Sequence, residues 1–365
     1  MPLTGREHTG GAKHPRGLRA YRHTHSESTG SLLDSGRDRT FGDEAMKGLC
    51  AALATAAVAF SAAAAADEWP SRPVRMVNTF AAGGTADVLT RLVADHLTTV
   101  FKQQFFVETR AGAGGAIAVQ SVASSPPDGY NFVLTNITQL VLLPISNPKL
   151  GYDPRRDLTN IAYVAGAPIM ISVNAASGVR TFQDLIAHAK KAGSPLTYSS
   201  SGVGSSGHLV GESFAQKAGI KVEHVPYKGA SQGIMDLVAG HIFFSAQTVS
   251  STAAQVRGGA LNAIVHTHAS RLPDFQDVPT FREMGIDLVA TTWFAISGPA
   301  RLPDDIVQKM NREIIRAVSK PEVQQRLRHD GLVVETMSVE QLKQYIDAET
   351  ARWKPVLEQV GLIGN

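Results

Sequence analysis

One unit of strand, glycine turn and helix at residues 74–97 constrains the fold most. The apolar run Val74 to Val77 is typical of a buried strand, and the segment Phe80 to Asp87 is typical of a tight turn. Gly83 and Gly84 let the backbone approach a ligand closely, and the positive N-terminus of the following helix favours an anion. The unit predicts an anion site, although a plain tight connection capped by Asp87 fits the same residues. The residues expected to face inward on the helix are Val88, Leu92, Val93 and Leu97.

An export signal is predicted shortly before this unit. Met46-Lys47 supplies a basic start, residues 48–60 are nearly all small or apolar, and Ala64-Ala65-Ala66 supplies a cleavage site. The signal peptide is therefore expected over Met46 to Ala66, so the mature chain is expected to be exported. Cys50, the only cysteine, leaves with the signal. Residues 1–45 are poor in apolar residues and are interpreted as a disordered leader or a mis-called start.

Charge and hydropathy exclude two broad classes of protein. The chain of 365 residues has a formal net charge of +3, and the part after Ala66 is nearly neutral. No basic surface is therefore expected that would follow a nucleic-acid backbone. No second apolar run reaches membrane-spanning length. The length that remains after the signal is typical of two domains of ordinary size.

Strands and helices alternate along the chain, which predicts an α/β protein with parallel sheets wrapped by helices. A crossover at Pro168 to Val173 is expected to lead into a second lobe over residues 168–291. A return strand at Trp293 to Ser297 is expected to complete a first lobe of residues 67–167 and 292–365, so that two crossings form a hinge. The other strands are expected at residues 74–77, 105–108, 130–135, 161–164, 196–199, 222–225, 242–245 and 263–265. The helices are expected at residues 117–123, 182–191, 208–218, 233–239, 304–318, 321–329, 339–353 and 353–359.

A second glycine-rich turn, Gly202 to Gly207, has more than one functional interpretation. Its GxGxxG spacing, with Glu223 at the end of the next strand, fits a dinucleotide fingerprint. Its serine hydroxyls and the helix that starts near His208 fit a second anion turn equally well. Export away from the main nicotinamide pool favours the anion turn. Ser205 with His208 also raises a hydrolase alternative, but the segment lacks the GxSxG spacing of such enzymes.

Two other patterns carry weaker signals. Pro226-Tyr227-Lys228-Gly229 lies between an expected strand and a helix, where open parallel sheets bind ligands, and a proline-fixed turn with a solvated lysine explains it as well. His266 and His268 lie on one face of an expected strand and fit a zinc pair, but no third ligand follows at a suitable spacing. No metal site is therefore expected.

Four segments occur in the order and spacing of one known family. They are Phe80 to Asp87, Gly112-Ala113-Gly114-Gly115, Pro127-Asp128-Gly129-Tyr130 and Val225 to Gly229. Together they resemble the signature of the Bug family, the periplasmic solute receptors of tripartite tricarboxylate transporters. Further agreement comes from Gly151-Tyr152-Asp153-Pro154, Arg271-Leu272-Pro273, Val278-Pro279-Thr280 and the segment Trp293 to Pro299.

The resemblance implies an α/β fold of two lobes, of the type II periplasmic binding protein kind, which closes like a hinged trap. It implies a receptor without catalytic activity or cofactor that captures a small mono-, di- or tricarboxylate or an acidic amino acid. The receptor is expected to be a monomer that hands its ligand to the membrane permease of a tripartite tricarboxylate transporter. A sensor kinase is an alternative partner, and no nucleic acid is expected. An exported dinucleotide-binding or hydrolytic enzyme that uses Gly202 to Gly207 remains the alternative function.

Carried over position by position, the resemblance also implies a binding site shared by both lobes. In the first lobe, backbone N–H groups are expected to hold one carboxylate at Ala82, Gly83, Gly84, Thr85, Asp87, Gly114 and Gly115. The second lobe is expected to contribute Ser201, Gly202, Gly204, Ser205, His208, Tyr227, Lys228 and Gly229. The rest of the ligand is expected to contact Thr135, Asn136 and Thr138.

Two positions after Gly240-His241-Ile242 depart from the family pattern. The family usually has an acidic residue there and another four positions later, whereas this chain has Phe243 and Gln247. Because a carboxamide carries no charge and donates as well as accepts, Gln247 is expected to change recognition of the distal end of the ligand. Thr79 also replaces a proline that is common in the family, which changes only backbone stiffness.

Overall fold

The computed structural model describes residues 69–359 and residue 363. The predicted leader, signal peptide and cleavage site lie outside the described residues, as does Cys50. Within the described part of the chain, every helix is too short or too polar to cross a bilayer.

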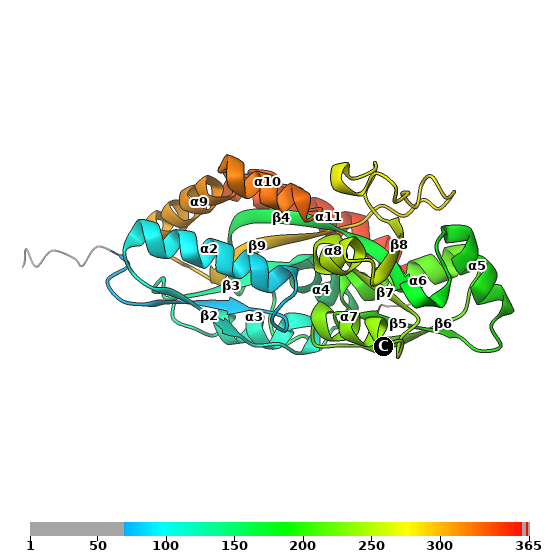
Figure 1. Cartoon of the computed structure of the whole chain (residues 1–365). Coiled ribbons are helices and arrows are strands. Elements are labelled where there is room, and N and C mark those ends of the chain that lie inside the picture. The colour runs from blue at the N-terminus through cyan, green and yellow to red at the C-terminus, as the bar shows by residue number, and fades with distance from the viewer. Residues whose placement is uncertain (1–68, 360–362, 364–365) are drawn as a thin grey trace, which may run out of the picture. The chain divides into compact units, whose positions relative to one another are not determined.

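Five strands form the first of two connected sheets, sheet A, in the order β2-β1-β3-β9-β4 (Figure 1). β1 (Val74–Asn78) lies parallel to β2 (Phe105–Thr109) and to β3 (Asn131–Asn136). β9 (Thr291–Pro299) is antiparallel to both β3 and β4 (Leu158–Asn174). Sheet A is therefore mixed, because β9 returns from the second sheet and runs against its neighbours.

Strand β4 also belongs to the second sheet, sheet B. There it pairs antiparallel with β7 (Phe244–Thr248) and β8 (Leu261–His266). β5 (Leu196–Ser200) lies parallel to β7 and to β6 (Val222–Pro226). The outer strands of both sheets are thus parallel, whereas the strands that connect the sheets are antiparallel.

The passage from one sheet to the other occurs within β4. Residues up to Pro168 pair with β9, and residues from Ile169 pair with β7 and β8. The expectation of a short strand followed by a separate crossover was wrong, since one strand of 17 residues replaces both. The residues of β4 are buried from Ile161 to Val173. The strand therefore has neighbouring strands and apolar contacts on both sides of the sheet change. The exact lobe boundaries stay a prediction.

Helices pack against both sheets. Their bounds are α2 (Thr85–Phe101), α3 (Ala116–Ala123), α4 (Leu143–Ser146), α5 (Phe182–Lys191), α6 (Ser206–Ala218), α7 (Ala230–Val238), α8 (Val249–Arg257), α9 (Asp304–Ser319), α10 (Pro321–His329) and α11 (Val339–Gln359). Short helical turns lie at η1 (Ala113–Gly115), η2 (Thr138–Leu142), η3 (Ala175–Ser177) and η4 (Pro273–Phe275).

The predicted position of α2 is correct, but its buried face differs from the prediction. Leu89, Val93 and Leu97 are buried, whereas Val88 and Leu92 are only partly buried. The helix packs on one side against β1 and β2 and on the other against α9, so its apolar stripe follows Leu89 rather than Val88.

Two helical segments that follow strands directly were not predicted. α8 is rich in Ser, Thr and Val, which have modest helix propensity, and η2 with α4 contains Pro144. Helix propensity therefore did not indicate a helix at either place. Both segments contribute to the cavity described below.

The C-terminal helix α11 packs against β4 and η2. It continues through Pro355, where two separate helices were expected, with Trp353 and Leu357 buried on either side of the proline. The buried carboxylate of Glu349 accepts hydrogen bonds from Trp293 Nε1 and Trp353 Nε1, both at 3.1 Å. Glu349 therefore links α11 to strand β9.

Candidate functional site

A cavity lies between the two sheets, at the point where β4 and β9 connect them. Its volume is about 40 Å³, enough for a few water molecules. Among the residues that form its described walls, none carries a charged side chain. The lining residues are Phe80, Gly84, Thr85, Ala86, Asn136, Thr138, Ile169, Ser201, Ser205, Ser206, Gly207, Ala230, Gln247, Thr248, Ser251, Thr292 and Phe294.

Four helices begin at this cavity. α2 begins at Thr85, α6 at Ser206 and α7 at Ala230, and Thr248 immediately precedes α8. Within the described chain, the N-cap residues of α2, α7 and α8 make no capping bond with their own side chains. Helix α5, whose first turn does not line the cavity, has a complete capping box instead. Uncapped N–H groups and four positive dipole ends around a neutral cavity stabilise a bound anion.

The turn that precedes α2 is fixed by its own side chains. Asn78 Nδ2 donates to the carbonyl oxygen of Phe80 at 2.8 Å. Gly83 has a φ of +85°, a conformation that favours glycine, and its N–H donates to Asp87 Oδ2 at 3.1 Å. Arg91 Nε donates to the other oxygen of Asp87 at 3.0 Å. The Asp87 carboxylate therefore holds the turn and pairs with arginine, outside the cavity.

Hydroxyl groups from α2 and from the start of α8 meet at the cavity wall. Thr85 Oγ1 lies 2.8 Å from Thr248 Oγ1, 2.5 Å from Ser250 Oγ and 2.9 Å from Ser251 Oγ. The backbone N–H of Thr85 also donates to Ser251 Oγ at 3.3 Å. These bonds join the start of α2 to the end of β7 and to the first turn of α8.

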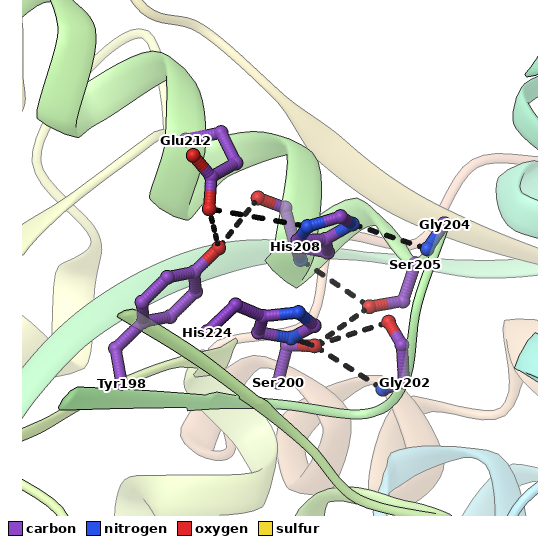
Figure 2. Close-up of polar contacts among 8 residues, drawn as sticks. All are labelled: Tyr198, Ser200, Gly202, Gly204, Ser205, His208, Glu212 and His224. Atoms are coloured by element: carbon purple, nitrogen blue, oxygen red, sulfur yellow. Dashed lines mark hydrogen bonds and ion pairs between the residues drawn. The ribbon is translucent and has the colours of Figure 1, made fainter. Parts of the chain in front are cut away.

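The turn between β5 and α6 is held by a polar network, shown in Figure 2. Ser205 Oγ accepts a bond from the His208 N–H and donates to Ser200 Oγ, both at 3.3 Å. Ser200 Oγ donates to the Gly202 carbonyl at 3.1 Å and accepts from the Gly202 N–H at 3.2 Å. It also lies 2.7 Å from His224 Nε2. The hydroxyl of Ser200, at the end of β5, therefore holds the turn in place, and the hydroxyl of Ser205 caps helix α6.

Two stacked histidine rings support this network (Figure 2). The rings of His208 and His224 have centroids 4.0 Å apart, and the Gly204 N–H donates to His208 Nδ1 at 3.2 Å. Burial lowers the pKa of His208, although nearby Glu212 opposes the shift. Burial, with a smaller contribution from His208, lowers the pKa of His224 to about 3. Both rings are therefore neutral near pH 7.

Replacement of His224 by glutamine is expected to make the protein less sensitive to acid. Between pH 6.5 and about 3 the unfolded chain protonates this histidine and the folded chain does not, so stability falls as the pH is lowered. His224→Gln is expected to reduce the loss of unfolding free energy between pH 7 and pH 4 by about 1 kcal/mol or more. Urea unfolding at both pH values measures this. An unchanged loss in the variant would contradict the neutral buried ring, and His241→Gln, which alters an exposed histidine, is the matched control.

Two buried polar atoms in the cavity wall have no hydrogen-bond partner among the described residues. They are Thr138 Oγ1 and Gln247 Nε2. Gln247 Oε1 accepts a bond from Ser201 Oγ at 2.7 Å, which fixes the side chain with its amide nitrogen free. Thr138 lies in η2, which directly follows strand β3 of sheet A, and Gln247 lies in strand β7 of sheet B. One unpaired polar atom therefore comes from each side of the cavity.

The structure brings many of the predicted site residues to this cavity or beside it. The cavity itself is lined by the predicted residues Gly84, Thr85, Asn136, Thr138, Ser201, Ser205 and Gln247. A second, neighbouring pocket, which shares Phe80 and Ser201 with the first, is lined by the predicted residues Gly114, Gly115, Gly202, Tyr227 and Lys228. The Tyr227 hydroxyl donates to Asp236 Oδ2 at 2.5 Å. This bond lies outside the first cavity and uses the proton of the hydroxyl.

The other predicted residues lie in different surroundings. Gly204 and His208 line a pocket with Leu143 and Leu357, and Asp87 lines a groove between α2 and α10. Thr135 Oγ1 donates to the carbonyl of Ala295 at 3.1 Å inside sheet A. None of the pockets named above is lined by Ala82, Gly83, Thr135 or Gly229.

Several residues of the cavity wall were not predicted. Thr248 and Ser251 belong to the start of α8, a helix that sequence pattern did not indicate. Phe80, Ile169 and Phe294 form the apolar part of the cavity wall. They are buried residues of strands or turns, so their sequence pattern does not distinguish them from other core residues. The run Thr248 to Thr252, rich in hydroxyls after a strand, was the one available signal for α8.

The enzymatic alternatives find no support in this geometry. The His208 ring stacks on His224 and accepts from the Gly204 N–H. Among the described residues, Ser205 Oγ bonds to the His208 backbone N–H and to the Ser200 hydroxyl, so it has no direct contact with a side-chain base. Gly207 is required for packing, since a Cβ there would lie 2.2 Å from the carbonyl oxygen of Ala246 on β7. Within the described residues, no group of three or more His, Cys, Asp or Glu side chains is placed to hold a metal ion.

The profile of one protein family matches residues 89–362, and its description is "Tripartite tricarboxylate transporter family receptor". The chain belongs to this family. The predictions of the family, of a binding receptor rather than an enzyme, and of a periplasmic type of protein are thereby confirmed. A relative from Cupriavidus necator, "UPF0065 protein in gbd 5'region", is 34% identical over 314 residues, which are 85% of this chain and 95% of the relative.

Solved structures of receptors share the fold. "R. palustris Rpa4515 with adipate" has 30% sequence identity and a TM-score of 0.78, and the match covers 80% of this chain and 99% of that one. "MatC (Rpa3494) from Rhodopseudomonas palustris with bound malate" has 26% identity and a TM-score of 0.75, with 79% of this chain and 100% of that one covered. The predicted α/β fold of a two-lobed periplasmic binding protein is confirmed.

Proposed function

We propose that this receptor captures a small organic carboxylate in the cavity between sheets A and B. The observation that carries the proposal is the convergence of four helix N-termini, three of them without a capping bond from the N-cap residue, on a cavity whose described walls are uncharged. Such a site balances a negative charge with backbone dipoles. Bound adipate and malate in two receptors of similar fold support the same class of ligand.

In this proposal one carboxylate group binds at the start of α2, near Gly84 and Thr85. Ser201, Ser205 and Gln247 contact the ligand from sheet B, and Asn136 and Thr138 contact it from sheet A. The apolar side chains of Phe80 and Phe294 cover its carbon chain. Because the ligand contacts both sheets at once, it favours the closed state over an open one.

The proposal also places the receptor in a transport system. A signal peptide over Met46 to Ala66 exports the chain to the periplasm, where the closed, loaded receptor delivers its ligand to the membrane permease of a tripartite tricarboxylate transporter. Membership in the receptor family supports this partner.

Isothermal titration calorimetry of the purified protein against succinate, L-malate, glutarate, adipate and citrate tests the function. Micromolar or tighter binding of at least one acid is expected, which corresponds to about −8 kcal/mol or better. Methyl esters of the same acids serve as matched ligands without charge and are expected not to bind. Absence of binding to every acid in the panel would contradict the proposal.

A further inference from the structure

The described walls of the cavity contain hydrogen-bond donors without partners but no free acidic group. The Gln247 side chain is 2% exposed and the Thr138 side chain 1% exposed, and Gln247 Nε2 and Thr138 Oγ1 both lack a partner. Buried polar atoms of this kind are costly unless a ligand completes them. The Gln247 amide nitrogen can only donate, so it points to a ligand that offers an acceptor oxygen, and the Thr138 hydroxyl is able to donate to the same ligand.

Several of the acceptor oxygens in the wall are already used within the protein. Gln247 Oε1 accepts from Ser201 Oγ at 2.7 Å, and Asn136 Oδ1 accepts from the Thr138 N–H at 2.7 Å. The hydroxyls of Ser206 and Thr292 pair with each other at 2.6 Å. A ligand ammonium group would have to compete with these bonds for an acceptor.

The electrostatics of the cavity act in the same direction. Four helix N-termini present positive dipole ends, and among the described residues no carboxylate lines the cavity to balance a cation. The nearest acidic side chain on α2, Asp87, is occupied by the Gly83 N–H and by Arg91. Desolvation of an ammonium group in these surroundings is therefore unfavourable.

We propose that Gln247 and Thr138 form a subsite that selects dicarboxylates without an amino group and rejects acidic amino acids. The Gln247 amide donates to an oxygen at the distal end of the ligand from sheet B, and the Thr138 hydroxyl bonds to the same end from sheet A. This inference rests on the proposed function and narrows its substrate class. The neutral carboxamide of Gln247, held in place by Ser201, then selects between a diacid and its amino counterpart.

Matched pairs of ligands that differ by one ammonium group test the inference. Calorimetry compares succinate with L-aspartate, glutarate with L-glutamate, and adipate with L-2-aminoadipate. In the pair whose chain length fits best, the plain diacid is expected to bind about 10- to 100-fold more tightly than its amino counterpart. Equal or tighter binding of the amino acid would overturn the inference while the proposed function stands. If no member of any pair binds and L-malate and citrate do not bind either, the proposed function fails instead.

Two substitutions assign the selectivity to the named residues. Gln247→Glu retains an acceptor for Ser201 but turns a carboxylate toward the ligand, so diacid affinity is expected to fall about 10-fold or more and the preference over the amino acid to shrink. Thr138→Val removes an unpartnered hydroxyl without orphaning another group, and diacid affinity is expected to fall several-fold. Gln325→Glu, the same charge change on the exposed face of α10, is the matched control and is expected to leave binding unchanged. Unaltered affinity and selectivity in both cavity variants would overturn the roles of these residues.

Discussion

Substitution of Gly84 by leucine is expected to abolish ligand binding and leave the fold intact. Gly84 has φ −92° and ψ 176°, which any residue adopts, so the backbone tolerates a side chain. A Cβ at this position would lie 3.7 Å from Ala230 Cβ and 3.9 Å from Ser251 Oγ, which is ordinary contact. The further atoms of leucine would enter the cavity and separate the start of α2 from the starts of α7 and α8.

Calorimetry is expected to show at least a ~100-fold loss of affinity for Gly84→Leu, equivalent to about 3 kcal/mol. Thermal unfolding without ligand is expected to change little, because the leucine side chain would occupy empty cavity space and its Cβ makes only ordinary contacts. Gly84→Ala is the matched control, since its single methyl group fits the space, and it should retain most of the affinity. Full affinity in the leucine variant would show that the ligand binds elsewhere.

Substitution of Glu349 by leucine is expected to cause a large loss of stability. Its carboxylate is 6% exposed and accepts bonds from the indole N–H groups of Trp293 and Trp353, and Arg352 Nη1 donates to its other oxygen at 3.0 Å. Leucine would leave two buried indole N–H groups unpaired and detach α11 from β9. We expect a loss of about 3–5 kcal/mol in the free energy of unfolding. Chemical denaturation of the ligand-free protein measures it.

The variant Glu349→Gln separates the hydrogen bonds from the charge. A carboxamide oxygen accepts from both indoles, whereas the ion pair with the half-exposed Arg352 is lost. Its cost is expected to be about 1 kcal/mol. If Glu349→Leu lowers the free energy of unfolding no more than Glu349→Gln does, the bonds to the indoles do not hold α11 in place.

The local chemistry of the chain could be predicted from its sequence because it depends on neighbouring residues. The turn from Phe80 to Asp87, the turn from Gly202 to Gly207 and most strands and helices follow from glycine placement and apolar period. The pattern also placed the sheet change near Pro168. It missed α8, because a helix of low intrinsic propensity forms there through its packing on β4, β7 and β8.

Residue order alone indicated that helix N-termini able to hold an anion follow several strands, and that Gln247 stands where the resemblance calls for an acid. The packing of the sheets sets which termini share one cavity, since their distances depend on how β4 and β9 connect the two sheets. It also decided that Asp87 and Tyr227 are occupied elsewhere and that Ser201 holds Gln247 with its amide nitrogen free. Hydrogen-bond partners far apart in the chain set these orientations, and no local pattern carries that information.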